Sequence, residues 1–378
     1  MPLEEIINRQ GIIISAPASG AGKTTVTLGL INAFARKRSV QPFKSGPDYI
    51  DSKFQSVAAD RPSYNLDTWA MSSSDILNMI GMVGPSDICI AEGSMGLFDG
   101  VISKGAGGNG STADLASITN WPVILVVDCA KQAQSVAALI TGFNSFRHDI
   151  TIGGVILNNI SSKRHEALVV SEVSKTKVPI LGVIPRSNEL TIPERHLGLV
   201  QAEDLSDLEQ LIFKLGTLIE ENCDLEAIAC TARKSSPAIP TLQKITPPAQ
   251  RIAIARDNAF TFTYSHLIEG WKKQGAEISF FSPLNDEPPS KSDDMVWLPG
   301  GYPELYLGRL SECKNFKNGL IDFSKKGPVH GECGGYMVLG RKIIGKGGQA
   351  YDMIGMFDLV TSFEKRKLNL GYRKAKAI

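Results

Sequence analysis

The chain has 378 residues, of which 43% are hydrophobic and 21% are charged, which is ordinary for globular domains with a sizeable core. Domains usually contain roughly 100–200 residues, so we expect two or three of them. Forty basic residues against thirty-nine acidic ones give a formal net charge of +1. This balance argues against a dedicated binder of nucleic acids or membrane surfaces, because both functions need a basic field.

The first half of the chain alternates between short apolar runs and helix-compatible segments. The runs are rich in β-branched residues and do not alternate with polar ones, as in strands buried on both faces of a parallel sheet. Strands are predicted at 11–16, 87–91, 123–127, 154–157 and 180–184, and helices at 24–37 and 133–146. The alternation predicts βαβ units in a doubly wound parallel sheet.

The second half repeats this alternation after a proline-rich segment. Residues 235–250 hold four prolines and only one charged residue, which is typical of a stiffened linker. Strands are predicted after it at 251–255, 277–281, 295–298 and 328–331. We therefore expect an N-terminal domain over 1–234, a linker over 235–250, and a second α/β domain over 251–378.

Cysteine usage and the apolar runs indicate the compartment. The six cysteines form no CxxC pair and are too few for a disulfide framework in a chain of this length, so a reducing cytoplasm is the simpler interpretation. Residues 1–10 lack the apolar stretch of a signal peptide. No apolar run approaches the roughly 18–20 residues of a membrane span. We expect a cytoplasmic protein without membrane or nucleic-acid partners.

A glycine-rich loop follows the first predicted strand and leads into a helix. Residues 16–25 read APASGAGKTT, in the strand–loop–helix context of a phosphate-binding loop. Small residues let backbone N–H groups turn toward phosphate oxygens, and the helix N-terminus adds partial positive charge. Lys23 would reach the β- and γ-phosphates of ATP, although Pro17 stands where the general pattern has glycine. The alternative is a turn that only caps a helix. The predicted nucleotide-binding residues are Ser19, Gly20, Ala21, Gly22, Lys23, Thr24 and Thr25.

Two further segments supply candidates for a Mg²⁺ site. One reads KSGPDYID from Lys44 onward, and Glu92 ends the buried strand predicted near residue 87. Ligands of doubly wound sheets bind at the carboxyl ends of strands, and Mg²⁺ takes one or two carboxylates besides phosphate oxygens. We predict Thr24, Asp48 and Glu92 as metal ligands. Asp51 would orient a substrate carboxylate or a water, and Lys44 would neutralise charge on the transferred phosphate. The alternative for either aspartate is a turn or a helix cap.

A cysteine in the second half lies in a sharp turn between a predicted strand and an apolar stretch. Residues 331–335 read GECGG, the arrangement of a nucleophile elbow with sulfur in place of oxygen. We predict that Cys333 is a nucleophile with a pKa lowered by the adjacent helix N-terminus; the alternative is a small buried hydrophobe. Backbone N–H groups for an oxyanion hole are predicted at Gly300, Gly301 and Gly334.

The base that a nucleophilic cysteine needs is not evident. None of the five histidines follows Cys333. His330 is three residues before it, on a predicted strand, and is interpreted as a packed strand residue.

Together these motifs resemble one family. The phosphate-binding loop, KSGPDYID, AEGSMGLFDG at 91–100 and the elbow cysteine are similar to those of the glutamine-dependent cobyrinate a,c-diamide synthases of corrinoid biosynthesis. The similarity extends through NLD at 65–67 and RIAIARD at 251–257, and so covers nearly the whole chain. Dethiobiotin synthetases lack the cysteine domain, and cobyric acid synthases are less similar in chain length and in the NLD stretch.

The resemblance implies a fold and a reaction. The fold would be α/β, with a P-loop NTPase-like, dethiobiotin synthetase-like domain followed by a class I glutamine amidotransferase domain of flavodoxin-like fold. ATP would phosphorylate a carboxylate of cobyrinate, and ammonia freed from glutamine through a cysteine thioester would convert each acyl phosphate into an amide, at side chains c and a. Positioning and charge neutralisation by lysines and Mg²⁺ are what phosphoryl transfer requires. The resemblance also implies that Asn158 contacts adenine and that 110–115 approaches the corrinoid, unless Ser111 or Asp114 only caps a helix.

One departure from the family concerns the amidotransferase domain. The family's triad histidine and its neighbour lie in a terminal segment that has no counterpart before Ile378. The domain is therefore expected to be incomplete at its C-terminus, either in a truncated fragment or with a defunct glutaminase. We expect such a chain to use free ammonia and hardly any glutamine.

Two alternatives stay open. The same chemistry can serve another tetrapyrrole, such as hydrogenobyrinic acid or nickel sirohydrochlorin, because one sequence does not locate the substrate pocket. A catalytically impaired nucleotide-binding regulator is a different class, which ATP hydrolysis dependent on both corrinoid and ammonia would argue against. A homodimer is compatible with the sequence, which does not determine the oligomeric state.

Overall fold

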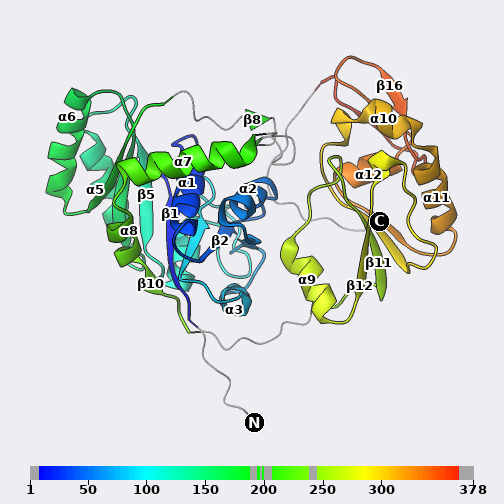
Figure 1. Ribbon diagram of the computed structural model, residues 1–378, viewed down its shortest axis with the longest axis horizontal. Coiled ribbons are helices and arrows are strands. Elements are labelled where there is room, and N and C mark those ends of the chain that lie inside the picture. Colours follow the sequence, from blue (N-terminus) through cyan, green and yellow to red (C-terminus); the bar gives the residue numbers. More distant parts are fainter. Residues whose placement is uncertain (1–7, 188–193, 196–197, 200–206, 238–244, 366–378) are drawn as a thin grey trace, which may run out of the picture. The chain divides into compact units, whose positions relative to one another are not determined.

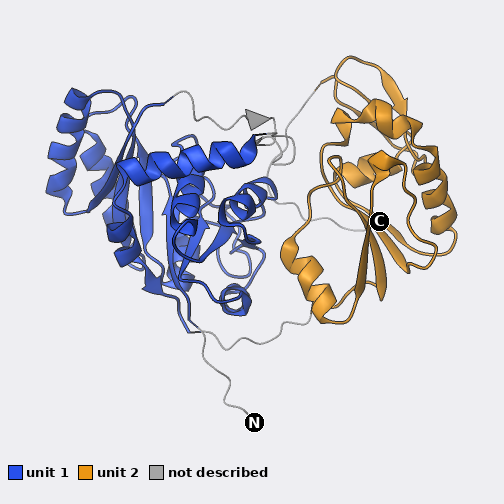
Figure 2. Cartoon of the chain, viewed as in Figure 1, with its two compact units in different colours: residues 1–243 blue, residues 244–378 orange. Residues whose placement is uncertain are grey.

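The computed structural model describes residues 8–187, 194–195, 198–199, 207–237 and 245–365. The chain divides into two compact units, residues 1–243 and residues 244–378 (Figure 2). The start of the predicted linker is bound to the first unit: Ser235 is buried, its N–H donates to the Arg9 carbonyl, and its hydroxyl accepts from the Arg9 N–H. Residues 238–244 of that linker lie outside the described residues.

A parallel sheet forms the centre of unit 1 (Figure 1). Its strands lie in the order β3-β2-β4-β1-β5-β6-β7, and each neighbouring pair along this path is parallel. The strands are β1 (Gln10–Ser15), β2 (Val40–Ser45), β3 (Tyr64–Leu66), β4 (Ile88–Glu92), β5 (Val123–Asp128), β6 (Ile152–Ile160) and β7 (Ile180–Pro185). β10 (Arg233–Lys234) pairs antiparallel with β1, and β8 (Glu194–Arg195) pairs with β9 (Gly198–Leu199). The predicted doubly wound parallel sheet is confirmed.

Helices cover both faces of this sheet. Alternate strand residues point to opposite faces, and on one face Ile13, Phe43 and Ala91 share a core cluster with residues of α3, α4, α5 and α6. On the other face α1 packs against α2 and α7. The helices are α1 (Lys23–Ala35), α2 (Ile50–Ala59), α3 (Ser73–Met82), α4 (Thr112–Thr119), α5 (Val136–Phe146), α6 (Lys163–Val173), η1 (Ser174–Thr176), α7 (Leu208–Asn222) and α8 (Leu225–Thr231).

Unit 2 is a smaller α/β body. Its parallel sheet has the order β12-β11-β13-β14, built from β11 (Arg251–Ala255), β12 (Glu277–Phe281), β13 (Met295–Leu298) and β14 (Val329–Gly331). A second sheet contains β15 (Lys342–Ile344), β16 (Ala350–Asp352) and β17 (Val360–Ser362). The helices are α9 (Ser265–Lys273), η3 (Pro283–Asn285), η4 (Pro303–Leu305), α10 (Leu307–Glu312), α11 (Lys314–Ser324) and α12 (Gly334–Leu339). Within the part of the chain that the structure describes, every helix falls short of the length and hydropathy that a membrane crossing requires.

Candidate functional site

Strand register brings three predicted features to one end of the unit 1 sheet. The loop of residues 16–22 leaves the carboxyl end of β1. On β4, Glu92 is in register with Ile14 of β1 on one side and with Lys44 of β2 on the other. Because the strands are parallel and register partners point to the same face, the loop, Lys44 and Glu92 meet at the edge where ligands of such sheets bind.

The loop between β1 and α1 has the backbone that the motif predicts. Gly20 and Gly22 have φ values of 80° and 84°, a left-handed conformation that favours glycine, and α1 begins immediately after Gly22. The Ala21 carbonyl accepts a 2.9 Å hydrogen bond from the Asn158 side-chain amide on β6. This contact closes the loop against the neighbouring strand.

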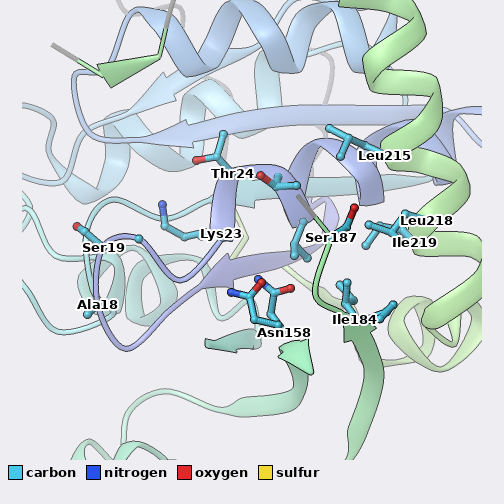
Figure 3. A pocket seen from close by; sticks show the side chains of 16 residues that line it. Ala18, Ser19, Lys23, Thr24, Asn158, Ile184, Ser187, Leu215, Leu218 and Ile219 are labelled. Carbon is cyan, nitrogen blue, oxygen red and sulfur yellow. The ribbon is translucent and has the colours of Figure 1, made fainter. Parts of the chain in front are cut away.

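A cavity of about 400 Å³ opens beside the loop (Figure 3). Loop residues, Lys23 and Thr24 form its polar side, with Asn158 near them. Apolar side chains from α7 line the opposite side: Leu215, Leu218 and Ile219. A phosphate-binding loop facing apolar side chains suits a ligand with phosphates at one end and a flat base at the other. Asn158 is one of the residues that line this cavity. Its contact with adenine stays a prediction.

Glu92 is the centre of a buried polar cluster. Its side chain has no exposed surface. Oε1 accepts from the Thr24 hydroxyl at 2.6 Å and pairs with the ammonium groups of Lys23 at 3.2 Å and Lys44 at 3.3 Å. Oε2 accepts from the Gln55 amide at 2.7 Å. A buried carboxylate with this many partners is held in one orientation, which preorganises the charges around the loop.

Lys44 joins the cluster to α2. Its side chain is buried, and its ammonium group forms a second ion pair with Asp51 in the first turn of α2. Asp48 lies just before this helix, where its Oδ1 accepts from the N–H groups of Ile50 at 2.7 Å and Asp51 at 3.2 Å. Asp48 therefore satisfies the first two N–H groups of α2 from the turn before the helix, which agrees with the turn alternative for a loop aspartate. Its role as a metal ligand stays a prediction.

Burial and charge pull the pKa values of the cluster in different directions. Burial raises the pKa of Asp51 to about 6, although the Lys44 ammonium opposes the shift. Burial acts the same way on Glu92, but Lys44, Lys23 and the Thr24 hydroxyl outweigh it and lower the pKa to about 2. The Lys44 pKa is raised, because Asp51 and Glu92 outweigh the effect of burial. Burial lowers the pKa of Lys23, and the nearby Lys44 charge adds to this effect. Glu92 is thus the firmly ionised acid of the cluster.

The donor set of the cluster fits a hard divalent cation. A carboxylate of low pKa and the Thr24 hydroxyl lie in contact, and oxygen ligands of this kind suit Mg²⁺, which takes few protein ligands when phosphates supply the others. Within the described residues no group of three or more histidine, cysteine or acidic side chains is arranged to hold a metal by itself. The site therefore fits a cation that arrives with a nucleotide.

The segment that follows Glu92 is tied to both neighbouring strand ends. The Gly93 N–H donates to the Ile14 carbonyl at 2.8 Å, and the Leu97 N–H donates to the Ala16 carbonyl at 2.8 Å. The Ser94 hydroxyl donates to the Ser45 carbonyl. Residues 93–97 therefore form a wall between the phosphate-binding loop and the end of β2.

The predicted corrinoid-approaching segment at 110–115 contains a helix cap. The Ser111 hydroxyl accepts from the Asp114 N–H at 3.2 Å at the start of α4. The Asp114 carboxylate accepts from the Asn109 N–H and pairs with Arg147. The capping alternative thus accounts for Ser111, and an approach of this segment to a corrinoid is untested.

In unit 2, Cys333 lies in the sharp turn that the sequence predicts. It follows β14 and precedes α12, with φ 49° and ψ −115°, a strained conformation for a residue other than glycine. The backbone N–H groups of Gly301 and Gly334, two of the residues predicted for an oxyanion hole, act on the thiol in the sense that lowers its pKa. The third, Gly300, provides space, because a Cβ there would lie 3.3 Å from the sulfur.

The prediction of a lowered pKa at Cys333 is wrong for this conformation. Burial raises the pKa of the thiol, and the negative charges of Glu304 and Glu332 add to the effect. The N–H groups of Gly334 and Gly301 act in the opposite sense but do not outweigh burial. α12 spans only six residues, so its N-terminus has a small dipole to offer.

The histidine before the elbow has other side chains as its recorded partners. His330 packs edge-on against Trp297, with ring centroids 5.5 Å apart, and lies 3.9 Å from the Glu332 carboxylate. The His330 side chain is half exposed, so this residue is less buried than the prediction of a packed strand residue implied. Among the histidines in the described ranges, none has a recorded hydrogen bond to Cys333, and His196 lies outside those ranges.

Two contributors to the site were not predicted. Gln55 is fully buried on α2 and donates to Glu92, and a run of leucine and isoleucine on α7 lines the cavity. For Gln55 the available signal was its position four residues after Asp51, which places both on one helical face. Nothing local distinguishes α7 from any amphipathic helix.

The comparisons with known proteins agree with this architecture. Residues 12–200 match the CobQ/CobB/MinD/ParA nucleotide binding domain, and residues 251–377 match the CobB/CobQ-like glutamine amidotransferase domain. The hydrogenobyrinate a,c-diamide synthase of Rhodobacter capsulatus is 48% identical over 367 residues, which cover 97% of this chain and 84% of that protein. The enzyme of the same name from Brucella anthropi is 47% identical over 370 residues, which cover 96% and 84%.

Solved structures are more remote. The septum site-determining protein MinD of Pyrococcus horikoshii is 18% identical, covers 58% of this chain and 98% of its own, and has a TM-score of 0.31, which is too low to support an argument.

Nucleotide-binding and amidotransferase domains in one chain define a class, the ATP-dependent ligases that form C–N bonds with glutamine as amido donor. Within that class the chain belongs to the a,c-diamide synthase family of corrinoid biosynthesis, the family that its motifs resemble.

Proposed function

We propose that this chain catalyses the ATP-dependent amidation of the a and c carboxylates of a corrin precursor, with nitrogen from glutamine or free ammonia. Family membership supports the reaction, and the names of the relatives favour hydrogenobyrinate over the cobalt-containing cobyrinate as the substrate. Within the chain, the observation that carries the proposal is the buried Lys23–Glu92–Lys44–Asp51 cluster. Its member Lys23 and the Thr24 hydroxyl group, which donates to Glu92, belong to residues that also line the nucleotide cavity.

The two halves of the reaction are assigned to separate domains. Residues 1–234 form the amidoligase domain in this proposal, 235–250 the linker, and 251–378 the amidotransferase domain. The assignment is supported by the match of the nucleotide-binding family to 12–200 and of the amidotransferase family to 251–377.

The first half-reaction activates a carboxylate. A carboxylate oxygen attacks the γ-phosphorus of ATP, the bond from phosphorus to the β–γ bridging oxygen breaks, and ADP leaves. Lys23 and Lys44 place positive charge beside the transferred group, and Glu92 with Asp51 fixes where these ammonium groups lie. Mg²⁺, held by Thr24 and Glu92, would supply further neutralisation of phosphate charge. Asp48 could join it through Oδ2, which has no recorded hydrogen bond to the residues that the structure describes.

The second half-reaction forms the amide. Ammonia attacks the acyl carbon, the bond to the phosphate oxygen breaks, and loss of a proton leaves the amide and inorganic phosphate. To supply the ammonia, the Cys333 sulfur attacks the amide carbon of glutamine, ammonia leaves, and water hydrolyses the thioester to glutamate. The Gly301 and Gly334 N–H groups, which favour the ionised form of this thiol, support an oxyanion hole beside it.

The experiment is a substrate comparison with purified protein. ADP release is measured with ATP, Mg²⁺ and ammonium in the presence of hydrogenobyrinate, cobyrinate or no macrocycle, and products are examined by mass spectrometry for the replacement of hydroxyl by amino groups. We expect ADP release to depend on the macrocycle and two amides to form, most efficiently on hydrogenobyrinate. Lys23→Met should remove this activity. Macrocycle-independent ADP release without amide products would overturn the proposal.

A further inference from the structure

Met95 has a backbone conformation that is unusual for methionine. Its backbone φ is 45°, and its side chain is 62% exposed, which is high for a large apolar residue. Glycine or asparagine accepts left-handed backbone with less strain than methionine does. Strained backbone of this kind clusters at active sites and ligand clamps.

The neighbours of Met95 hold it in a fixed place beside the reaction centre. The Ser94 hydroxyl is bonded to the end of β2, and Leu97 N–H to the phosphate-binding loop. At Gly96 an added Cβ would lie 2.6 Å from the Pro17 carbonyl, so the chain touches that loop directly. Met95 is three residues beyond Glu92, and three residues span at most about 11 Å.

This position is separate from the nucleotide site. The 93–97 segment is not among the residues that line the nucleotide cavity. An acceptor carboxylate must approach the γ-phosphate from a side that the nucleotide does not occupy. Residues 93–97, which carry Met95, contact the phosphate-binding loop at Ala16 and β2 at Ser45 without lining the nucleotide cavity, so we assign them to such a side.

We infer that the Met95 side chain packs against the face of the macrocycle and positions its acid arms toward Lys23 and Lys44. The inference rests on the proposed function and identifies a contact for its acceptor. A corrin presents a broad conjugated surface, and a polarisable thioether packs favourably on such surfaces. The strained turn is then maintained because it points this side chain away from the protein.

The test compares four variants with the wild-type protein. Met95→Ala and Met95→Gly remove the side chain, and Gly also relieves the backbone strain. Met95→Leu keeps an apolar side chain of similar size. Leu168→Ala removes a 39% exposed apolar side chain on α6 and serves as the matched control. KM for hydrogenobyrinate and for ATP is measured by ADP release with ammonium, and Kd for hydrogenobyrinate by absorbance titration with a non-hydrolysable ATP analogue.

We expect KM and Kd for the macrocycle to rise about tenfold or more in Met95→Ala and Met95→Gly, with KM for ATP unchanged. Met95→Leu and Leu168→Ala should stay within about threefold of wild type. Unchanged macrocycle affinity in both Met95→Ala and Met95→Gly would overturn the inference. Wild-type affinity in Met95→Gly alone would also overturn it, because the role of Met95 would then lie in its backbone and not in its side chain. If the wild-type protein shows no macrocycle-dependent ADP release, the proposed function itself fails, which is a distinct result.

Discussion

The pKa of Asp51 leads to a prediction about stability. Burial raises this pKa from 3.8 to about 6. Because the folded state binds the proton more tightly than the unfolded state, the group stabilises the protein fully below pH 4, and this contribution is lost as pH rises through 6. A shift of about two units corresponds to about 3 kcal/mol. In Asp51→Asn this titration is absent, so the free energy of unfolding of the wild type minus that of the variant should fall by most of this amount, about 2 kcal/mol, between pH 4 and pH 7.

The assay must report unit 1 alone, because a chain with two compact units need not unfold in one step. Trp271 and Trp297 belong to the core of unit 2, so replacing both by phenylalanine leaves the tryptophan fluorescence to unit 1. Urea unfolding is then followed at several pH values. Asp60→Asn, at the exposed C-terminal end of the same helix, changes the formal charge equally and serves as the matched control for the loss of one negative charge. A free-energy difference that does not change with pH would mean that the Lys44 ion pair balances burial, and one that grows with pH would mean that the ion pair outweighs burial. Either result would refute the reasoning.

Three further predictions concern the two sites. Glu92→Gln leaves two buried lysines with one acid, so the free energy of unfolding should fall by roughly 3–5 kcal/mol and ADP release should disappear; intact stability would contradict the cluster's role. Gly22→Ala should abolish ATP binding in a calorimetric titration, because the added Cβ would lie 2.3 Å from the side-chain amide nitrogen of Asn158. Gly20→Ala is the control: the space around Gly20 is open, so the added methyl group should cost only about 1–2 kcal/mol of backbone strain. Alkylation of Cys333 by iodoacetamide, followed by peptide mass spectrometry, should be slow at pH 7 and still accelerate at pH 9, because the thiol pKa is raised. Glu332→Gln should speed it, and an unchanged rate would show that this charge does not act on the sulfur.

Features that depend on local sequence were predicted well. The five predicted strands of unit 1 and the four of unit 2 are present, because continuous apolar runs leave few alternatives to burial in a parallel sheet. The phosphate-binding loop and the cysteine elbow were also recognisable, since both depend on glycines at short fixed spacing. In contrast, β2 was not predicted. It contains Pro42 and Lys44, and its burial is possible only because acids from β4 and α2 neutralise the lysine.

Features that depend on distant residues could not be predicted. Gln55 contacts Glu92 across 37 positions of sequence, and the α7 side chains that line the cavity lie far along the chain from the loop that they face. The thiol pKa was predicted with the wrong sign because the motif considers a helix N-terminus, whereas the folded environment adds burial and the charges of Glu304 and Glu332. The hydrogen bonds of Asp48 were likewise hard to predict, because they depend on where α2 begins in the folded chain.

The pairing of Lys44 with Glu92 across adjacent strands has a consequence for how this chain tolerates insertions. Side chains along a strand alternate, so inserting or deleting one residue upstream in β2 would exchange odd and even positions. Phe43, which now faces the apolar core opposite Ala91, would then stand among the acids, and the ammonium group would enter a hydrocarbon environment. Length changes between residues 40 and 44 should therefore be harmful even when composition is preserved.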